Sequence, residues 1–226
     1  MLDIGCGTGQ LTDYFRAIGF ATVGVDSSTA MLRHRVQHRS GRPGLVAAAG
    51  AAGLPLVGQF DLITLTFNVF NHLPDQTAAK SVLAEVARLL APTGLCVFDI
   101  NTELGLRQTG ELTEIRVGGS DRIVWCRRWA GDRLVLDASG SFLDGGAWHP
   151  YRERIHKRVI HTAEFEGWCE ASGLLRPSWR SDDLTTPLED PEESAIAYGL
   201  IRGPAAPSSA DDADAATGGR SEVLSP

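Results

Sequence analysis

The chain opens on the stretch Leu2-Asp3-Ile4-Gly5-Cys6-Gly7-Thr8-Gly9, a short apolar run that enters a turn with glycine at every second position. Apolar side chains then recur at helical spacing over residues 11–18, and Gly19 follows them, as glycine often follows a last helical turn. The pattern predicts a strand, a tight loop and a helix. Alternate glycines leave bare main chain for a ligand, and the unpaired N–H groups at the helix start face it.

Three kinds of nucleotide-binding loop share this outline. A phosphate-binding P-loop ends in Gly-Lys-Ser/Thr, which this stretch lacks. A dinucleotide site has the spacing G-x-G-x-x-G, whereas the third glycine here comes one residue early. The E/DxGxGxG loop of class I S-adenosylmethionine (SAM) methyltransferases matches residue for residue from Asp3 to Gly9, and the sequence resembles that family. A structural glycine turn is the remaining alternative.

The resemblance implies a set of cofactor contacts. The acidic Asp3 and the loop main chain would hold the amino-acid end of SAM. Asp26, at the end of the second predicted strand, would bind the ribose hydroxyls; capping the next helix is its alternative role. Met31 would pack on adenine or else lie in the core. The complete set of expected cofactor contacts is Asp3, Gly5, Cys6, Gly7, Gly9, Asp26, Ser27, Met31, Ala51, Thr66 and Phe67.

The loop after the third predicted strand departs from the family pattern. Near Gly50 or Ala51 the family usually carries an aspartate that accepts a hydrogen bond from the adenine amino group. Residues 47–53 offer no side-chain acceptor. Losing one such bond costs about 1 kcal/mol, so we expect weakened SAM binding.

Strand and helix patterns alternate up to about residue 100. Strands are predicted at residues 21–26, 45–48, 60–66 and 95–100, with helices at about 27–36 and 77–90. Repeated strand–helix units imply a parallel sheet whose ligands bind beyond the carboxyl ends of the strands. With the resemblance, the expected fold class is α/β: a Rossmann-like, doubly wound, mostly parallel seven-stranded sheet with helices on both faces, plus a small antiparallel β insertion.

The second half of the chain has a different order of predicted elements. Strand–turn–strand patterns predict a three-stranded antiparallel meander within an insertion at about residues 113–160. Thr162 is expected to cap a helix, and strands near residues 177–181 and 195–201 would form the antiparallel hairpin that closes the sheet in this family. Residues 1–202 would then be the methyltransferase domain.

The sequence also predicts the character of the two ends of the chain. Residues 203–226 are poor in apolar side chains and are predicted to be a disordered tail. Family members normally carry helices before the first strand, whereas this chain begins inside that strand, so we expect an N-terminally truncated domain.

The segment Thr66-Phe67-Asn68-Val69-Phe70-Asn71-His72-Leu73 follows the fourth predicted strand and should face the transferred methyl group. It resembles the corresponding segment of small-molecule methyltransferases. His72 is the candidate general base, because an unperturbed imidazole pKa of about 6.5 suits proton removal at neutral pH. A capping or structural histidine is the alternative. Asn68 and Asn71 are expected to contact the acceptor.

A row of cationic side chains lies on one face of the last meander strand: Arg152, Arg154, His156 and Arg158. Such a row suits a phosphate or carboxylate group of a substrate; a solvated face or a homodimer contact is the alternative. In the methyltransferases that this strand resembles, the insert covers the active site or pairs subunits. Arg154, His156 and Arg158 are therefore expected acceptor contacts.

The composition of the chain limits the kinds of partner that it is expected to bind. The chain has 226 residues, 43% of them hydrophobic, and a net charge of −7, which argues against a general nucleic-acid-binding surface. It has no apolar run of the ~20 residues that span a bilayer, no signal-peptide pattern and no C-x-x-C pair, so we expect a cytoplasmic protein with no membrane partner and no metal site.

The expected function is transfer of a methyl group from SAM to an oxygen or nitrogen atom of a small-molecule acceptor. A non-catalytic partner subunit, or a degenerate remnant of the fold, is the alternative. Nicotinamide-dependent oxidoreduction is a third reading of the glycine loop.

Overall fold

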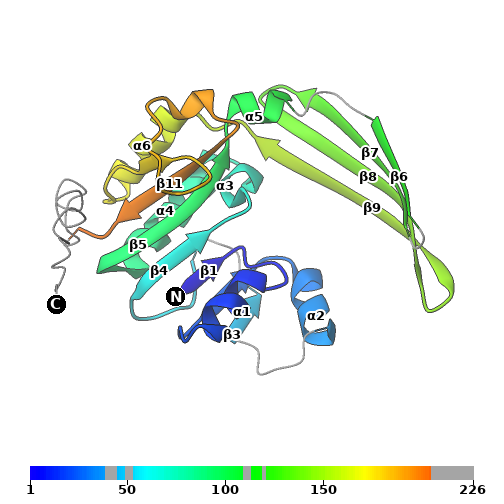
Figure 1. Ribbon diagram of the computed structural model, residues 1–226, viewed down its shortest axis with the longest axis horizontal. Coiled ribbons are helices and arrows are strands. Elements are labelled where there is room, and N and C mark those ends of the chain that lie inside the picture. Colours follow the sequence, from blue (N-terminus) through cyan, green and yellow to red (C-terminus); the bar gives the residue numbers. More distant parts are fainter. Residues whose placement is uncertain (39–44, 49–52, 109–112, 119–120, 205–226) are drawn as a thin grey trace, which may run out of the picture.

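The computed structural model describes residues 1–38, 45–48, 53–108, 113–118 and 121–204, which form two β-sheets with flanking helices (Figure 1). The larger sheet has the strand order β10-β11-β5-β4-β1-β2-β3. Neighbouring strands from β1 to β5 pair in parallel, whereas β11 runs antiparallel to β5, and β10 to β11. The strands of this sheet are β1 (Leu2–Ile4), β2 (Val23–Asp26), β3 (Leu45–Ala48), β4 (Phe60–Leu65), β5 (Leu90–Asn101), β10 (Ser178–Arg180) and β11 (Ile196–Arg202).

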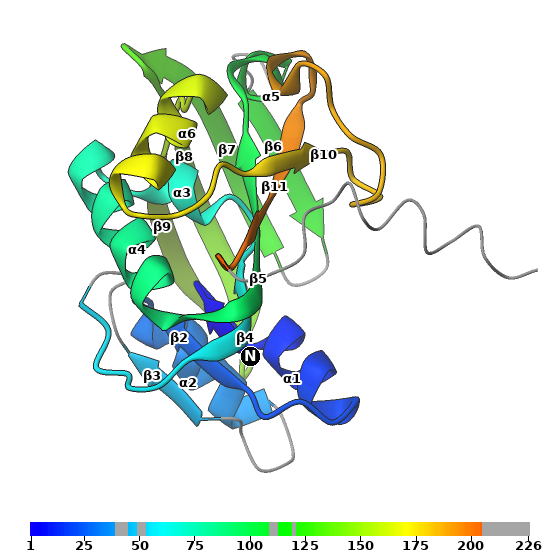
Figure 2. The same ribbon diagram turned by 90° about the vertical axis from the view of Figure 1, so that its left-hand side faces the viewer.

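This arrangement confirms the expected Rossmann-like α/β fold with a mostly parallel sheet and a closing antiparallel hairpin. The chain order reverses between β1 and β4, which makes their carboxyl ends the switch point where such sheets bind ligands. Helices cover both faces, with α1 and α4 on opposite sides of the sheet (Figure 2). The helical elements are α1 (Gln10–Ala17), α2 (Thr29–His38), α3 (Val69–His72), α4 (Gln76–Leu89), α5 (Glu103–Gln108), α6 (Thr162–Ala171) and the 3₁₀ turn η1 (Pro191–Glu193).

The longest helix, α4, shows how the sequence builds these elements. The Asp75 carboxylate caps it by accepting a 2.8 Å hydrogen bond from the main-chain N–H of Ala78. Its apolar side chains recur every three or four residues and are buried against the sheet: Ala79, Val82, Leu83, Val86 and Leu89. The core continues through a cluster of aromatic rings, which consists of Phe70, Phe98, Phe165, Trp168 and Trp179.

The insertion is a four-stranded antiparallel sheet: the three predicted strands are present, and a further strand, which was not predicted, precedes them. Its order is β6-β7-β8-β9, and it extends away from the larger sheet (Figure 1). The additional strand, β6, is six residues long and largely exposed, and its apolar side chains alternate with charged ones over only four residues. The strands are β6 (Thr113–Gly118), β7 (Asp121–Ala130), β8 (Arg133–Asp144) and β9 (Ala147–Arg158).

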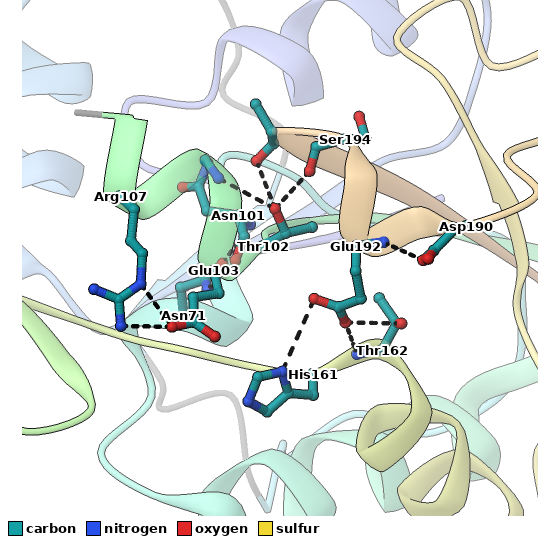
Figure 3. Close-up of polar contacts among 12 residues, drawn as sticks. Asn71, Asn101, Thr102, Glu103, Arg107, His161, Thr162, Asp190, Glu192 and Ser194 are labelled. Carbon is teal, nitrogen blue, oxygen red and sulfur yellow. Dashed lines mark hydrogen bonds and ion pairs between the residues drawn. The ribbon is translucent and has the colours of Figure 1, made fainter. Parts of the chain in front are cut away.

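Three local predictions need correction. The short helices α3 and α5 were not predicted, because four and six residues are too few to show a helical period. Thr162 does not cap α6: His161 is the N-cap, and Glu192 accepts hydrogen bonds from the N–H and hydroxyl of Thr162 at 2.6 and 2.9 Å (Figure 3). Gly203 was assigned to the tail, yet it is buried and donates to the Gly94 carbonyl. Residues 205–226 of that tail lie outside the described residues.

Candidate active site

A cavity of about 800 Å³ opens at the carboxyl ends of β1, β2 and β4. Its volume is within the usual range for small-molecule sites. The β1–α1 loop, the start of α2, the segment after β4 and strand β9 all contribute to its wall. The wall contains ten of the residues predicted from the sequence: Asp3, Gly5, Cys6, Gly7, Asp26, Ser27, Met31, Thr66, Phe67 and His72.

The glycine loop has the conformation that its sequence demands. Gly5, Gly7 and Gly9 have φ angles of 77°, 53° and 73°, in the left-handed region that side chains disfavour. A Cβ atom on Gly5 would lie 2.6 Å from Val69 Cγ2, whereas one on Gly7 would meet no atom within 4 Å. Gly5 therefore permits close packing, and Gly7 leaves open space beside bare main chain. Gly9 is not part of the cavity wall and instead forms the N-cap of α1.

Asp3 anchors this loop from below. Its side chain is 2% exposed, and its two carboxylate oxygens accept hydrogen bonds from the hydroxyls of Thr12 and Thr64 at 2.9 and 2.8 Å. Burial raises the pKa of Asp3 more than these two bonds lower it. Asp3 thus ties β1 to α1 and β4 at the cavity floor. Sequence analysis missed both threonines, since their partnership with Asp3 depends on the packing of three elements.

Asp26 connects the first two loops of the fold. One oxygen accepts from the N–H of Gly7 and the other from the N–H of Ser28, both at 2.7 Å. The helix-capping alternative is wrong, because the Ser28 hydroxyl caps α2 through the N–H of Met31. Met31 is 48% exposed at the cavity wall, which excludes the alternative of a core role. Ala51, the predicted adenine contact, lies outside the described residues.

The segment after β4 presents Phe67 and His72 to the cavity. Phe67 has a φ angle of 66° and is 81% exposed, although phenylalanine favours neither condition. The pKa of His72 lies below its ordinary value because the surrounding protein desolvates the charged ring. The positive charge of Lys157 lowers this pKa further, against the opposing effects of Asp99 and Glu153. The direction of this shift favours the neutral form of the His72 imidazole.

A polar network fixes the conformation of this segment. The N–H and side-chain amide of Asn68 both donate to Asp99 Oδ2 at 2.9 Å. Lys157 of β9 donates to Asn68 Oδ1 at 2.7 Å and to Asn101 Oδ1 at 3.3 Å. These bonds hold Asn68 at a φ angle of 58° and join the β insertion to β5. They also keep the Lys157 ammonium out of the cavity wall.

Comparison with known proteins agrees with this geometry. Residues 2–98 match the model of a family described as "methyltransferase domain". Residues 2–98 of this chain are therefore similar to a methyltransferase domain. Putative methyltransferase YqeM of Bacillus subtilis is 24% identical over 200 residues, which are 86% of this chain and 79% of that protein. A ubiquinone biosynthesis O-methyltransferase of Thiobacillus denitrificans is 36% identical over 104 residues, 43% of this chain and 42% of its own. Several curated relatives are thus matched over only about two fifths of their length.

Solved structures show the same fold. A SAM-dependent methyltransferase from Clostridium acetobutylicum has a TM-score of 0.79 at 22% identity, over 89% of this chain and 82% of that one. CalS10, an amino pentose methyltransferase from Micromonospora echinaspora with SAM bound, has a TM-score of 0.66 at 19% identity over the same shares. None of the helices in the described ranges is long and apolar enough to cross a membrane.

Two predicted acceptor contacts, Asn68 and Asn71, are corrected by the structure. Neither is part of the cavity wall. Asn71 is 0% exposed; its amide donates to the carbonyls of Asn101 and Arg158, both at 2.9 Å, and its oxygen accepts from the N–H of Asn101 at 2.8 Å. It therefore joins α3 to β5 and β9. A buried structural asparagine and a substrate-binding one look alike in sequence, which explains the error.

Replacing Asn71 by alanine is expected to lower the free energy of unfolding by about 1–3 kcal/mol, because it leaves buried main-chain groups of β5 and β9 unpaired. Urea denaturation measures the loss. Gln76→Ala, which truncates an exposed amide on α4, is the control and should stay within about 0.5 kcal/mol of wild type. Equal stability of the two variants would contradict the structural role of Asn71.

The cationic row also needs correction. Successive side chains of a strand face opposite sides, and the β9 residues in the cavity wall are Glu153 and Ile155. Arg154, His156 and Arg158 therefore face away from the cavity. Arg154 pairs with Asp137, and the Arg158 guanidinium lies over the Trp168 ring at 5.2 Å from its centroid. The sequence shows the alternation but not which face of the strand meets the glycine loop.

Proposed function

We propose that this protein transfers a methyl group from SAM to an oxygen or nitrogen atom of a small-molecule acceptor. The main support for this proposal is the glycine loop. Its bare main chain, together with Asp26, lines a cavity at the switch point of the sheet. The names of similar proteins support both atom types: one relative is a ubiquinone biosynthesis O-methyltransferase, and KedS8, a similar structure, is a sugar N-methyltransferase.

The residues present fit SAM. Open space beside Gly7 leaves room for a ligand against the main chain, and a buried carboxylate, Asp3, lies beneath the loop. Asp3 and the loop would hold the amino-acid end, Asp26 the ribose, and Met31 the adenine face. When bound, SAM supplies a methyl group already activated by its sulfonium charge. The protein then needs only to align the acceptor, exclude water and, where the acceptor carries a proton, remove it.

Calorimetry with SAM tests the proposal. We expect measurable heat and an increase in melting temperature with SAM, and none with NADH. No heat and no thermal shift at millimolar SAM would overturn the proposal and favour a non-catalytic role for the fold.

Asp26→Asn is expected to weaken SAM binding about 10- to 100-fold, because a charged hydrogen-bond acceptor contributes roughly 1.5–3 kcal/mol. The amide would also turn a donor toward the N–H groups of Gly7 and Ser28. Asp61→Asn removes the same charge from an exposed position near the start of β4, whereas the cavity lies beyond the end of that strand. This control substitution should leave the SAM dissociation constant unchanged. Similar affinities for SAM in both variants would show that Asp26 does not bind the ribose.

A further inference from the structure

The part of the cavity that faces away from the glycine loop is mostly apolar. It is formed by the segment after β4, the start of α4 and strand β9. Its apolar side chains are Leu73, Pro74, Ala78, Val82 and Ile155, and Val69 lies between them and Gly5. Thr66, His72 and Glu153 are the polar side chains beside them. An acceptor seated here would bury hydrocarbon and meet few polar groups.

Glu153 gives this region a negative charge. The described residues that line the cavity include no lysine or arginine. Lys157 lies on the same face of β9, but its ammonium donates to Asn68 and Asn101. The other two carboxylates in the wall, Asp3 and Asp26, belong to the glycine-loop side, where each already binds two protein donors. The region thus favours a cation and disfavours an anion.

One oxygen of Glu153 remains available to a ligand. The Tyr151 hydroxyl donates to Oε2. Among the residues that the structure describes, no donor contacts Oε1. Tyr151 therefore orients the carboxylate, and Oε1 can accept from a charged donor, which forms a stronger hydrogen bond than a neutral one.

His72 lines the same cavity as Glu153, and its chemistry complements the negative charge of that carboxylate. Both side chains line the cavity, and the charge of Glu153 acts on the imidazole. The lowered pKa of His72 keeps the ring neutral, so it can accept a proton. A carboxylate that attracts a cation and a neutral base that can remove its proton are what an amine requires before methylation.

We infer that the acceptor is an apolar amine, bound as its ammonium ion to Glu153 and deprotonated by His72. The inference rests on the proposed methyl transfer. His72 takes one proton from the ammonium group and becomes imidazolium. The freed nitrogen lone pair forms the N–CH₃ bond as the S–CH₃ bond breaks, and the sulfonium charge passes to the methylated nitrogen, leaving S-adenosylhomocysteine (SAH). The cationic row on the other face of β9 has no part in acceptor recognition.

Three probes of matched shape and different charge test this inference: phenethylamine, phenethyl alcohol and phenylacetate. Each is titrated into the full chain with and without SAH, and its dissociation constant is measured by calorimetry. We expect the amine to bind about tenfold more tightly than the alcohol, which corresponds to one charge-assisted contact, and the carboxylate to bind least tightly. Phenylacetate binding as tightly as phenethylamine, or no amine binding, would overturn the inference.

Two variants locate the source of the preference. Glu153→Gln keeps the shape of the side chain and should abolish the tenfold preference for the amine. Asp144→Asn removes an equal charge from the exposed end of β8 in the same insertion and should retain the preference. A preference that survives in Glu153→Gln would overturn the role of Glu153.

The SAH titration separates this inference from the proposed function. SAH binding without a preference for the amine would overturn only the assignment of the acceptor. An amine preference without SAH binding would overturn methyl transfer and leave Glu153 as a cation site.

Discussion

His72→Gln is expected to lower kcat for methyl transfer to a protonated amine about 100- to 10,000-fold, the usual contribution of a positioned general base. Glutamine retains a polar side chain of similar reach but cannot accept the proton. SAM binding should change little, because the proposed cofactor contacts lie on the glycine-loop side of the cavity. A radiolabelled-methyl transfer assay gives kcat, and calorimetry gives SAM affinity.

His161→Gln is the matched control for this substitution. His161 lies at the N-cap of α6, outside the cavity, and faces Glu192 (Figure 3). Its replacement should leave kcat unchanged. A wild-type kcat in the His72 variant would show that alignment of the acceptor with SAM is sufficient and that no base acts.

The dependence of kcat on pH gives a second measure of the same base. The imidazole accepts a proton only while neutral, which requires a pH above its pKa. Because that pKa is lowered, kcat should hold through neutral pH and fall only below about 6.5. Three charged groups act on the ring: Lys157 lowers its pKa, and Asp99 and Glu153 raise it. Lys157→Met removes the positive charge and should move the acid limb of kcat to higher pH; a shift to lower pH would contradict the assignment.

Phe165→Ala is expected to destabilise the fold by about 3–5 kcal/mol, a large part of the roughly 5–15 kcal/mol that stabilises a typical protein. The ring is 0% exposed at the centre of the aromatic cluster. Its centroid lies 4.8 Å from that of Phe70 and 4.9 Å from that of Phe98. Since Phe70 fixes α3, which also carries His72, the cavity left by the substitution should lower kcat as well.

Urea denaturation measures the effect, and Phe67→Ala is its control. That substitution removes the same ring from a side chain that is 81% exposed, so stability should stay within about 0.5 kcal/mol of wild type. A loss of less than 1 kcal/mol in Phe165→Ala, relative to about 3 kcal/mol expected, would show that the cluster can close over the gap.

The larger sheet was predictable because its strands are short apolar runs separated by clear turns. Strand β4 (Phe60–Leu65) is an example, whereas the hairpin of β10 and β11 was expected from the resemblance to the family. The insertion was harder, because its first strand, β6, is short and largely exposed, although β8 buries Leu134, Val135 and Ala138. In β6 the side chains of Ile115 and Val117 point into solvent, at 69% and 74% exposure.

The cofactor side of the cavity was predictable for a different reason. Its chemistry depends on a contiguous loop, so spacing alone identifies Gly5 and Gly7. The acceptor side is built from residues distant in sequence, and only the fold brings Glu153 to His72. Charged side chains on β9 were visible in the sequence, but the face that they occupy depends on how the insertion docks.

The pairing of β5 with β11 has a consequence for how the chain acquires its structure. Seven residue pairs join strands that are separated by the whole insertion and α6. During synthesis, the apolar edge of β5 must therefore wait for nearly 100 further residues, roughly 5–20 seconds at typical translation rates. Such distant pairing slows folding and leaves an open strand edge prone to aggregation. Recombinant yield should consequently depend on growth temperature and on chaperones that shield nascent chains.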